Sequence, residues 1–241
     1  MKNADQWQSQ RWKWDERKNR YVPNLAKVYP GSIHIADIQI QAYYPVLREH
    51  ITGRLLDCGC DKVPYYGMYK DITSEVVCTD WEVTREGNPF VDFYSDLNQP
   101  LEIETSSFDT VLLTDVLPHI RKPHDLFAEF FRILRPGGKA IVTCTFINWM
   151  GEPPHEFGHY SEYGLRAFAE SAGLEVVQLD SYGGYPDVLI DTLNKGMTGR
   201  ISNRFFRFFR AMAISTPWYR NSRRKTMRSY GIGYILVARK P

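Results

Sequence analysis

The sequence of 241 residues lacks any long apolar run. Its longest apolar stretch without a charge covers residues 140–151, well short of the roughly 20 residues that a helix needs to cross a bilayer. The first residues are polar and basic, and no apolar segment of a secretory signal follows them. We therefore expect no membrane-spanning helix and a cytoplasmic protein.

Cysteine is scarce, and sequence repeats are missing. The four cysteines, Cys58, Cys60, Cys78 and Cys144, each lie in an apolar run typical of a buried strand, which favours reduced thiols over a disulfide framework. The 17 glycines and 14 prolines follow no fixed period, which excludes collagen-like and solenoid folds. With 43% hydrophobic and 24% charged residues, the chain can bury the core of one domain.

Acidic residues are missing from the C-terminal fifth of the chain. Residues 192–241 contain 12 lysines and arginines and no aspartate or glutamate, although the net charge of the whole chain is only +2. The 18 basic and 28 acidic residues before them give that part a net charge of −10. A basic region of this kind suggests an anionic partner, which could be phosphate, nucleic acid or lipid headgroups.

Strand-like and helix-like patterns alternate from residue 54 to residue 180. This alternation predicts an α/β fold, a Rossmann-like doubly wound sheet of about seven strands, mostly parallel with an antiparallel last strand. Pro136, Gly137 and Gly138 are predicted to end a helix and turn the chain into a strand. We divide the chain into an N-terminal extension with a helix from about Ser32 to His50 (1–50), a core (51–185), a basic aromatic helical insertion (186–228) and the last core strand (229–241).

The first strand of the predicted core ends in a pattern that suits ligand binding. In open α/β sheets the ligand binds beyond the carboxyl ends of the strands, where the first turn must let backbone approach it. Asp57, Gly59 and Cys60 occupy that turn. Asp80 lies 23 residues after Asp57, at the end of the next strand, where an acidic side chain accepts hydrogen bonds from ribose hydroxyls. An ordinary strand end with a tight turn is the alternative interpretation.

At these residues the chain resembles the class I S-adenosylmethionine-dependent methyltransferases, especially a bacterial group whose first motif is LD-x-GCG-x-x-PY. The resemblance runs over residues 54–179, and its further parts are SFD at 107–109, LTDVLPHI at 113–120, LRPGGKAIVT at 134–143 and the segment 154–176. The sequence departs from the motif at Asp61 and Val63, which stand where glycine is usual. This departure motivates a second hypothesis, a non-catalytic binding module on the same fold.

The resemblance implies S-adenosyl-L-methionine as the cofactor. Trp81 is expected to stack on the adenosine, although an exposed aromatic residue at a strand end is the alternative. Asp96 and Leu97 look like the family's adenine-contacting pair. The full set of expected cofactor contacts is Asp57, Gly59, Cys60, Asp80, Trp81, Asp96, Leu97 and Thr114.

Methyl transfer from a sulfonium is an in-line displacement, so the protein has to position the acceptor and remove its proton. Histidine, with an unperturbed pKa of about 6.5, suits this task, and His119 closes the fourth core strand. A hydrogen bond from His119 to the backbone is the alternative role. The predicted catalytic residues are His119, His155 and Asp115, and the predicted acceptor-binding residues are His159, Tyr160, Arg223 and Arg224.

Residues 155–159 also match the zinc-protease pattern HExxH, which requires a helix to bring both histidines to one face. Pro153 and Pro154 precede the match and Gly158 lies inside it, which disfavours a helix. We therefore predict no metal.

The predicted function is O-methylation of a small or glycan- or lipid-linked acceptor, with an anionic acceptor as one option.

The insertion before the last strand has an amphipathic pattern. Helical spacing places an apolar arc opposite a basic one, namely Phe205, Phe206, Phe208, Phe209 and Met212 opposite Arg200, Arg204, Arg207 and Arg210. Such a helix suits peripheral membrane contact through residues 200–228, or it packs its phenylalanines on the sheet. An RNA-binding role for the basic region is a further alternative, but no nucleic acid is expected because the chain has no recognisable RNA-binding module.

Overall fold

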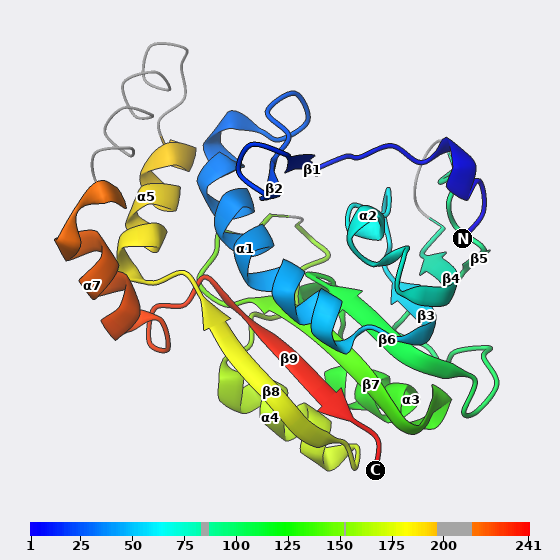
Figure 1. The fold of residues 1–241 in the computed structure, drawn as a ribbon. Helices are drawn as coiled ribbons and strands as arrows, with labels where there is room; N and C mark the ends of the chain where they lie inside the picture. The colour runs from blue at the N-terminus through cyan, green and yellow to red at the C-terminus, as the bar shows by residue number, and fades with distance from the viewer. Residues whose placement is uncertain (83–86, 152, 197–213) are drawn as a thin grey trace.

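The computed structural model describes residues 1–82, 87–151, 153–196 and 214–241 (Figure 1). Its main sheet consists of β3 (Gly53–Cys58), β4 (Thr73–Asp80), β5 (Phe93–Tyr94), β6 (Phe108–Thr114), β7 (Leu134–Thr145), β8 (Glu175–Tyr182) and β9 (Gly233–Arg239). The strand order is β5-β4-β3-β6-β7-β9-β8, and β9 is antiparallel to both of its neighbours while the other pairs are parallel. The prediction of a Rossmann-like, mostly parallel sheet with an antiparallel last strand is confirmed.

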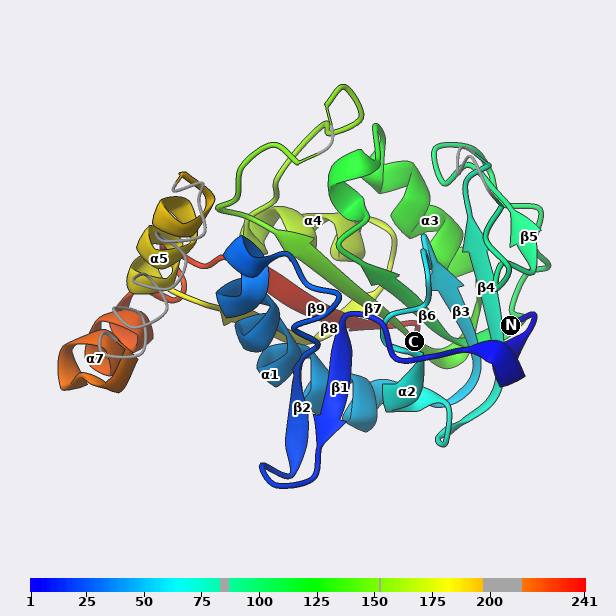
Figure 2. The same ribbon diagram turned by 90° about the horizontal axis from the view of Figure 1, so that it is seen from above.

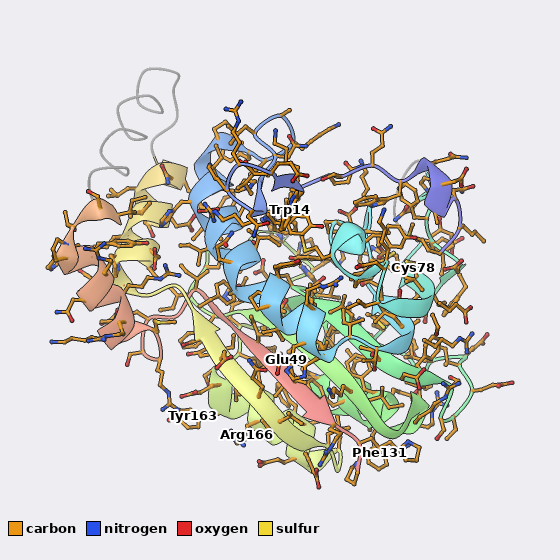
Figure 3. All side chains as sticks on the ribbon, in the orientation of Figure 1. Trp14, Glu49, Cys78, Phe131, Tyr163 and Arg166 are labelled. Carbon is orange, nitrogen blue, oxygen red and sulfur yellow. The ribbon has the colours of Figure 1, made fainter. Side chains whose placement is uncertain are left out.

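Helices cover both faces of this sheet (Figure 2). They are α1 (Ile33–His50), α2 (Tyr66–Tyr69), α3 (Pro123–Ile133), α4 (Glu162–Ser171), α5 (Tyr185–Gly196) and α7 (Pro217–Thr226), with short 3-10 turns η1 (Ala4–Gln6), η2 (Pro30–Ser32) and η3 (Leu117–His119). Helices α1 and α2 pack in one hydrophobic cluster, and α3 and α4 pack in a second cluster on the opposite face. The outer side of α4 carries Tyr163 and Arg166, which point away from the sheet (Figure 3).

Burial on both faces explains the apolar strand sequences. Side chains of consecutive strand residues point to opposite faces, and accordingly Leu55 lies in the cluster with α1 while Leu56 lies in the cluster with α3. A strand that is covered on both sides must be apolar at every position rather than at alternate ones. The near-continuous apolar runs of the sequence follow from this arrangement.

The N-terminal part contains the expected helix as α1, but it is not helical throughout. It forms a hairpin of β1 (Trp12–Asp15) and β2 (Arg20–Pro23) before α1 begins. Trp12 is buried, its indole nitrogen donates a hydrogen bond of 2.9 Å to the carbonyl of Ala36 in α1, and its ring stacks on Tyr65 at 4.6 Å. These contacts come from residues far away in the sequence, so local pattern alone did not predict the hairpin.

The turn from α3 into β7 also differs from the prediction. Helix α3 ends at Ile133 and β7 begins at Leu134, so residues 136–138 belong to the first part of the strand. The pairing of β6 with β7 shifts register there, and Gly137 has a φ of 79°. Its amide donates a hydrogen bond of 2.9 Å to the carbonyl of Lys240. The glycines thus shape the start of the strand and do not end the helix.

Helices α5 and α7 pack against each other beside α1. Asp187 of α5 is fully buried and joins the three helices: it contacts Nε2 of His34 at 2.9 Å, accepts a hydrogen bond from the hydroxyl of Tyr219 and lies 3.3 Å from Nε of Arg223. The predicted phenylalanine and arginine arcs of residues 200–212 lie outside the described residues. Within the described part of the chain, no helix is both long and apolar enough to cross a membrane.

Candidate functional site

The turn after β3 is held close to its neighbours. Gly59 has a φ of 65°, and a β-carbon at this position would lie 2.5 Å from Cγ2 of Val116, so no other residue fits without a shift. The amides of Gly59 and Cys60 both donate to the carbonyl of Thr79, at 2.9 and 3.2 Å. The turn is therefore fixed against the end of β4.

Asp57 lies at the base of this turn, and only one of its two carboxylate oxygens has a hydrogen-bond partner in the part of the chain that the structure describes. It is 1% exposed, and its Oδ2 accepts a hydrogen bond of 2.7 Å from the hydroxyl of Tyr69. Its Oδ1 is buried and has no hydrogen-bond partner among the described residues. Burial raises the pKa of Asp57 to about 7. A buried acceptor without a donor is costly, so this oxygen fits a donor or positive charge supplied by a ligand.

Asp61 and Val63 keep a backbone conformation that favours glycine. Their φ angles are 43° and 50°. The amide of Asp61 donates a hydrogen bond of 2.8 Å to Oδ2 of Asp80, and the carbonyl of Val63 accepts one of 3.0 Å from the indole of Trp7. A β-branched residue with positive φ is strained, and these contacts hold it in place. The departure from the glycine motif therefore changes side chains and leaves the left-handed path of the turn intact.

Asp80 ends β4 and faces the same turn. Its Oδ1 accepts a hydrogen bond of 2.8 Å from the amide of Trp81, while its Oδ2 accepts the one from Asp61. Burial raises the pKa of Asp80, and the two backbone hydrogen bonds oppose this shift. Each carboxylate oxygen can accept a second hydrogen bond, which is what the hydroxyls of a ribose require. Trp81 beside it is 40% exposed, as a stacking residue needs to be.

The remaining predicted cofactor residues lie at the same edge of the sheet. Asp96 is exposed in the loop after β5, where its Oδ1 accepts from the amide of Asn98 at 2.9 Å. The side chain of Leu97 is instead buried in the cluster with α3. Thr114 is half-buried at the end of β6. Asp57, Gly59, Cys60, Asp80 and Trp81 thus form the part of the site whose contacts fit the cofactor best.

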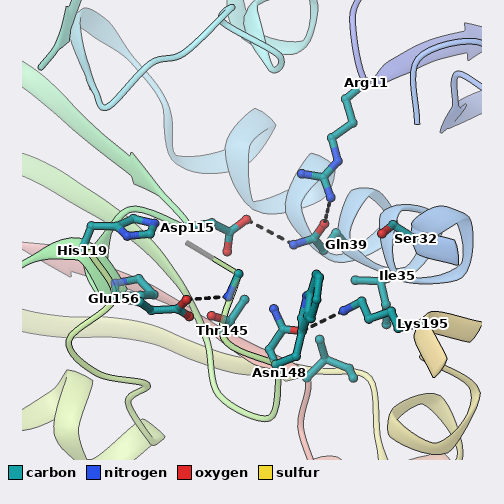
Figure 4. A pocket seen from close by; sticks show the side chains of 14 residues that line it. Arg11, Ser32, Ile35, Gln39, Asp115, His119, Thr145, Asn148, Glu156 and Lys195 are labelled. Carbon is teal, nitrogen blue, oxygen red and sulfur yellow. Dashed lines mark hydrogen bonds between the residues drawn. The ribbon is translucent and has the colours of Figure 1, made fainter. Parts of the chain in front are cut away.

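A cavity of about 210 Å³ lies at the carboxyl ends of β6 and β7 (Figure 4). Among the residues predicted from sequence, Asp115 and His119 line it. The other lining residues are Arg11, Ser32, Ile35, Gln39, Pro118, Thr145, Asn148, Trp149, Gly151, Glu156, Lys195 and Ile232. The cavity is therefore polar and shared between the core, the N-terminal part and α5.

His119 is oriented by the loop that follows β7. Its Nδ1 lies 2.6 Å from the carbonyl oxygen of His155. Since a carbonyl only accepts, the proton of the neutral ring is on Nδ1 and the lone pair is on Nε2. This ring lies in the wall of the cavity.

The other two predicted histidines, His155 and His159, make contacts within and beside the loop after β7. The ring of His155 does not line the cavity and contacts Trp81 edge to face, with 5.3 Å between ring centres. His159 faces acceptors on both sides, the carbonyl of Phe146 at 3.2 Å and Oε1 of Glu156 at 2.5 Å. The contacts of His159 are thus made within the loop and with its neighbour Phe146.

The remaining predicted acceptor residues lie away from the cavity. Tyr160 packs edge to face on Phe168 of α4, 5.1 Å between ring centres. Arg223 pairs with the buried Asp187, and Arg224 is exposed on α7. None of the three lines the cavity. Residues 155–159 are not helical, and no group of three His, Cys, Asp or Glu side chains among the described residues could hold a metal ion.

Asp115 connects the cavity to residues that sequence analysis missed. Its Oδ2 accepts a hydrogen bond of 3.1 Å from Gln39, and its Oδ1 accepts one of 3.0 Å from Tyr43. Burial raises the pKa of Asp115, and the positive charge of Arg11 opposes this shift. One signal was present in the sequence: Gln39 is one of the few polar residues on the mostly apolar buried side of α1. Arg11 and Lys195 carried no such signal.

Residues 56–142 match the sequence model of a methyltransferase domain family. Residues 56–142 therefore form a methyltransferase domain, similar to those of S-adenosylmethionine-dependent enzymes. A curated relative, the demethylmenaquinone methyltransferase of Renibacterium salmoninarum, is 27% identical over 128 residues, which cover 47% of this chain and 49% of that enzyme. The chain thus matches about half the length of this relative. S-adenosyl-L-methionine is the cofactor of this domain class, as the sequence predicted.

Solved structures share the fold of the methyltransferase domain. A methyltransferase from Archaeoglobus fulgidus superposes with a TM-score of 0.56 at 15% identity, covering 88% of this chain and 95% of that one. The [4+2]-cyclase SpnF superposes with a TM-score of 0.54 at 21% identity, covering 84% of this chain and 82% of that one. At such identities the likeness concerns the fold alone.

Proposed function

We propose that the protein transfers a methyl group from S-adenosyl-L-methionine to an oxygen atom of a small or glycan- or lipid-linked acceptor. When bound, this cofactor supplies an activated methyl group on a positively charged sulfur. The residues that would hold it are Asp57, Gly59, Cys60, Asp80 and Trp81 at the ends of β3 and β4. The observation that carries the proposal is the position of His119, which lines a polar cavity next to these residues.

The chain's own residues account for the remaining requirements of the reaction. His119 removes the proton of the acceptor hydroxyl through Nε2, while the carbonyl of His155 keeps the proton on Nδ1 and fixes the ring. Asp115, which also lines the cavity and is held by Gln39 and Tyr43, orients the acceptor. Positioning of the acceptor in line with the methyl group supplies most of the rate.

The first test is calorimetry with S-adenosylhomocysteine, followed by incubation with labelled S-adenosylmethionine and a panel of hydroxyl-bearing glycans and lipid-linked sugars. Binding and label transfer to an oxygen atom support the proposal. The similarity to a [4+2]-cyclase motivates the alternative, a different or non-catalytic role on the same fold. Cofactor binding without transfer to any member of the panel would favour that alternative.

On an acceptor found in this way, His119→Gln is expected to lower kcat about 10²- to 10⁴-fold, because a base within hydrogen-bond reach of the acceptor is lost. The affinity for S-adenosylhomocysteine should not change. His124→Gln is the matched control, since His124 bonds Ser171 and does not line the cavity. Stopped assays across pH 5 to 9 measure kcat, and calorimetry measures the affinity for S-adenosylhomocysteine. A kcat equal to that of the control would remove His119 from the mechanism.

We also propose that the basic C-terminal region makes peripheral contact with anionic membranes. Residues 185, 189 and 193 share one side of α5 and are exposed, with Leu193 at 51%. In α7, Trp218 is 60% exposed, and the same helix also exposes Arg220, Arg224 and Lys225. An exposed aromatic side chain among cations is complementary to the anionic headgroups and apolar interior of a bilayer surface.

Trp218→Ala combined with Arg224→Glu is expected to weaken association with vesicles containing phosphatidylserine about tenfold or more, without changing the melting temperature. Co-sedimentation at 50 and 300 mM salt measures this association. Leu25→Ala is the control, because Leu25 is 58% exposed in the N-terminal part. A parent protein that binds RNA and no vesicles would support the RNA-binding alternative instead.

A further inference from the structure

The wall of the cavity away from the sheet is built by segments outside the methyltransferase motifs. Ile35 and Gln39 share one side of α1, because residues four apart share a helix face, and Ser32 lies directly before this helix. Arg11 is bonded to Gln39 at one end of this row, and Lys195 of α5 stands toward Ile35 (Figure 4). Two cations from distant parts of the chain therefore meet at one cavity.

Arg11 is a cation held in a defined position, and most of its N–H hydrogen-bond donors are not used. Its Nη2 donates one hydrogen bond of 3.3 Å to Oε1 of Gln39, and its guanidinium lies over the ring of Trp12 at 5.0 Å. Among the described residues no carboxylate lies within ion-pair distance of it. A guanidinium has five N–H groups, so most of its donors remain for a ligand. Its charge is also not neutralised by a direct partner.

Lys195 adds a second donor whose position is fixed. Its side chain is 17% exposed, and its Nζ donates to Oδ2 of Asp191 at 2.7 Å and to Oδ1 of Asn148 at 2.9 Å. An ammonium group has three protons, and these two bonds use two of them. Asp191 offsets the charge of Lys195, so this residue acts chiefly as a hydrogen-bond donor beside the charged Arg11.

We propose that Arg11 and Lys195 bind an anionic group of the acceptor, a carboxylate or a phosphate, and so direct its hydroxyl to His119. The inference rests on the proposed function. Asp115 and Glu156 also line the cavity and repel an anion near them. Gln39 stands between Asp115 and Arg11, which leaves the Arg11 and Lys195 end of the cavity as the place for the anion. A planar guanidinium binds either kind of oxyanion through two parallel hydrogen bonds. The acceptor thus has its anionic end and its reacting end at opposite walls.

The experiment measures binding of inorganic phosphate and of succinate by calorimetry, each with the protein saturated with S-adenosylhomocysteine. The parent is expected to bind at least one probe, and the preferred probe identifies phosphate or carboxylate as the anion. Arg11→Met and Lys195→Met should each weaken that binding about tenfold or more, whereas Lys122→Met, on the exposed start of α3, should not. Arg11→Lys keeps the charge and should fall between Arg11→Met and the parent.

The affinities for S-adenosylhomocysteine separate this inference from the proposed function. They should be equal in the parent, Arg11→Met and Lys195→Met. If Arg11→Met weakens S-adenosylhomocysteine binding tenfold, Arg11 serves the carboxylate of the cofactor and the inference is overturned. Binding of S-adenosylhomocysteine by the parent with no binding of either probe also overturns it while leaving methyl transfer intact. Failure to bind S-adenosylhomocysteine, with phosphate or succinate still bound, contradicts the proposed function alone.

Discussion

Asp80→Ala is expected to bind S-adenosylhomocysteine about ten- to a hundredfold more weakly than the parent. Loss of hydrogen bonds from ribose hydroxyls to a charged acceptor costs about 1.5 to 3 kcal/mol, which corresponds to this range. The structure adds a second cause, because Oδ2 of Asp80 also holds the amide of Asp61 in the turn after β3. Calorimetry gives the affinity, and a thermal melt shows that the variant is folded.

Two further variants test whether the loss of affinity comes from the carboxylate of Asp80. Asp80→Asn keeps the shape of the side chain and should lose part of the affinity, because a neutral amide accepts more weakly than a carboxylate. Asp180→Ala removes an exposed carboxylate from β8 and should leave the affinity unchanged. If Asp80→Ala binds as tightly as Asp180→Ala, the ribose site has been placed wrongly.

Asp187→Ala is expected to lower the free energy of unfolding by about 3 to 5 kcal/mol, the usual cost of removing one member of a buried ion pair. The substitution leaves Nε2 of His34 and the hydroxyl of Tyr219 without their shared partner, and both side chains are buried. It also leaves the guanidinium of Arg223 without its ion-pair partner. For a chain of this size the melting temperature should fall by on the order of 10 °C.

The matched comparison is an exposed ion pair on the same side of the sheet. Asp37 of α1 pairs with Arg20 at 3.0 Å, and both side chains are more than a third exposed. Asp37→Ala should therefore change the free energy of unfolding by less than about 1 kcal/mol. Urea titrations of both variants measure the difference. Equal midpoints for the two variants would show that Asp187 does not hold α5 and α7 to α1.

The parts of the fold and site that were predictable from sequence depend on neighbours along the chain. Strands covered on both faces give apolar runs, and the spacing of Asp57, Gly59 and Asp80 reflects one strand, one turn and the next strand. The hairpin of β1 and β2 was not predictable, because its stability comes from contacts of Trp12 with α1 and Tyr65.

The same reasoning applies to the cavity. His119 and Asp115 were found because they follow β6 directly, whereas Arg11, Gln39 and Lys195 come from three separate segments that meet only in the folded chain. The HExxH match, which its prolines and Gly158 disfavoured as a helix, is indeed not helical. Glu156 and His159 do interact, but as a contact within a loop and not as neighbours on a helix face.

The position of β9 has a consequence for the synthesis of the protein. Strand β9 lies between β7 and β8, and residues 183–232 separate it from β8 along the chain. Until these residues have left the ribosome, β8 has no strand to pair with and the facing edge of β7 is open. Unpaired edges of this kind attract other chains. A stalled or truncated chain that ends before Gly233 is therefore expected to be a substrate for chaperones and proteases, even though its cofactor motifs are complete.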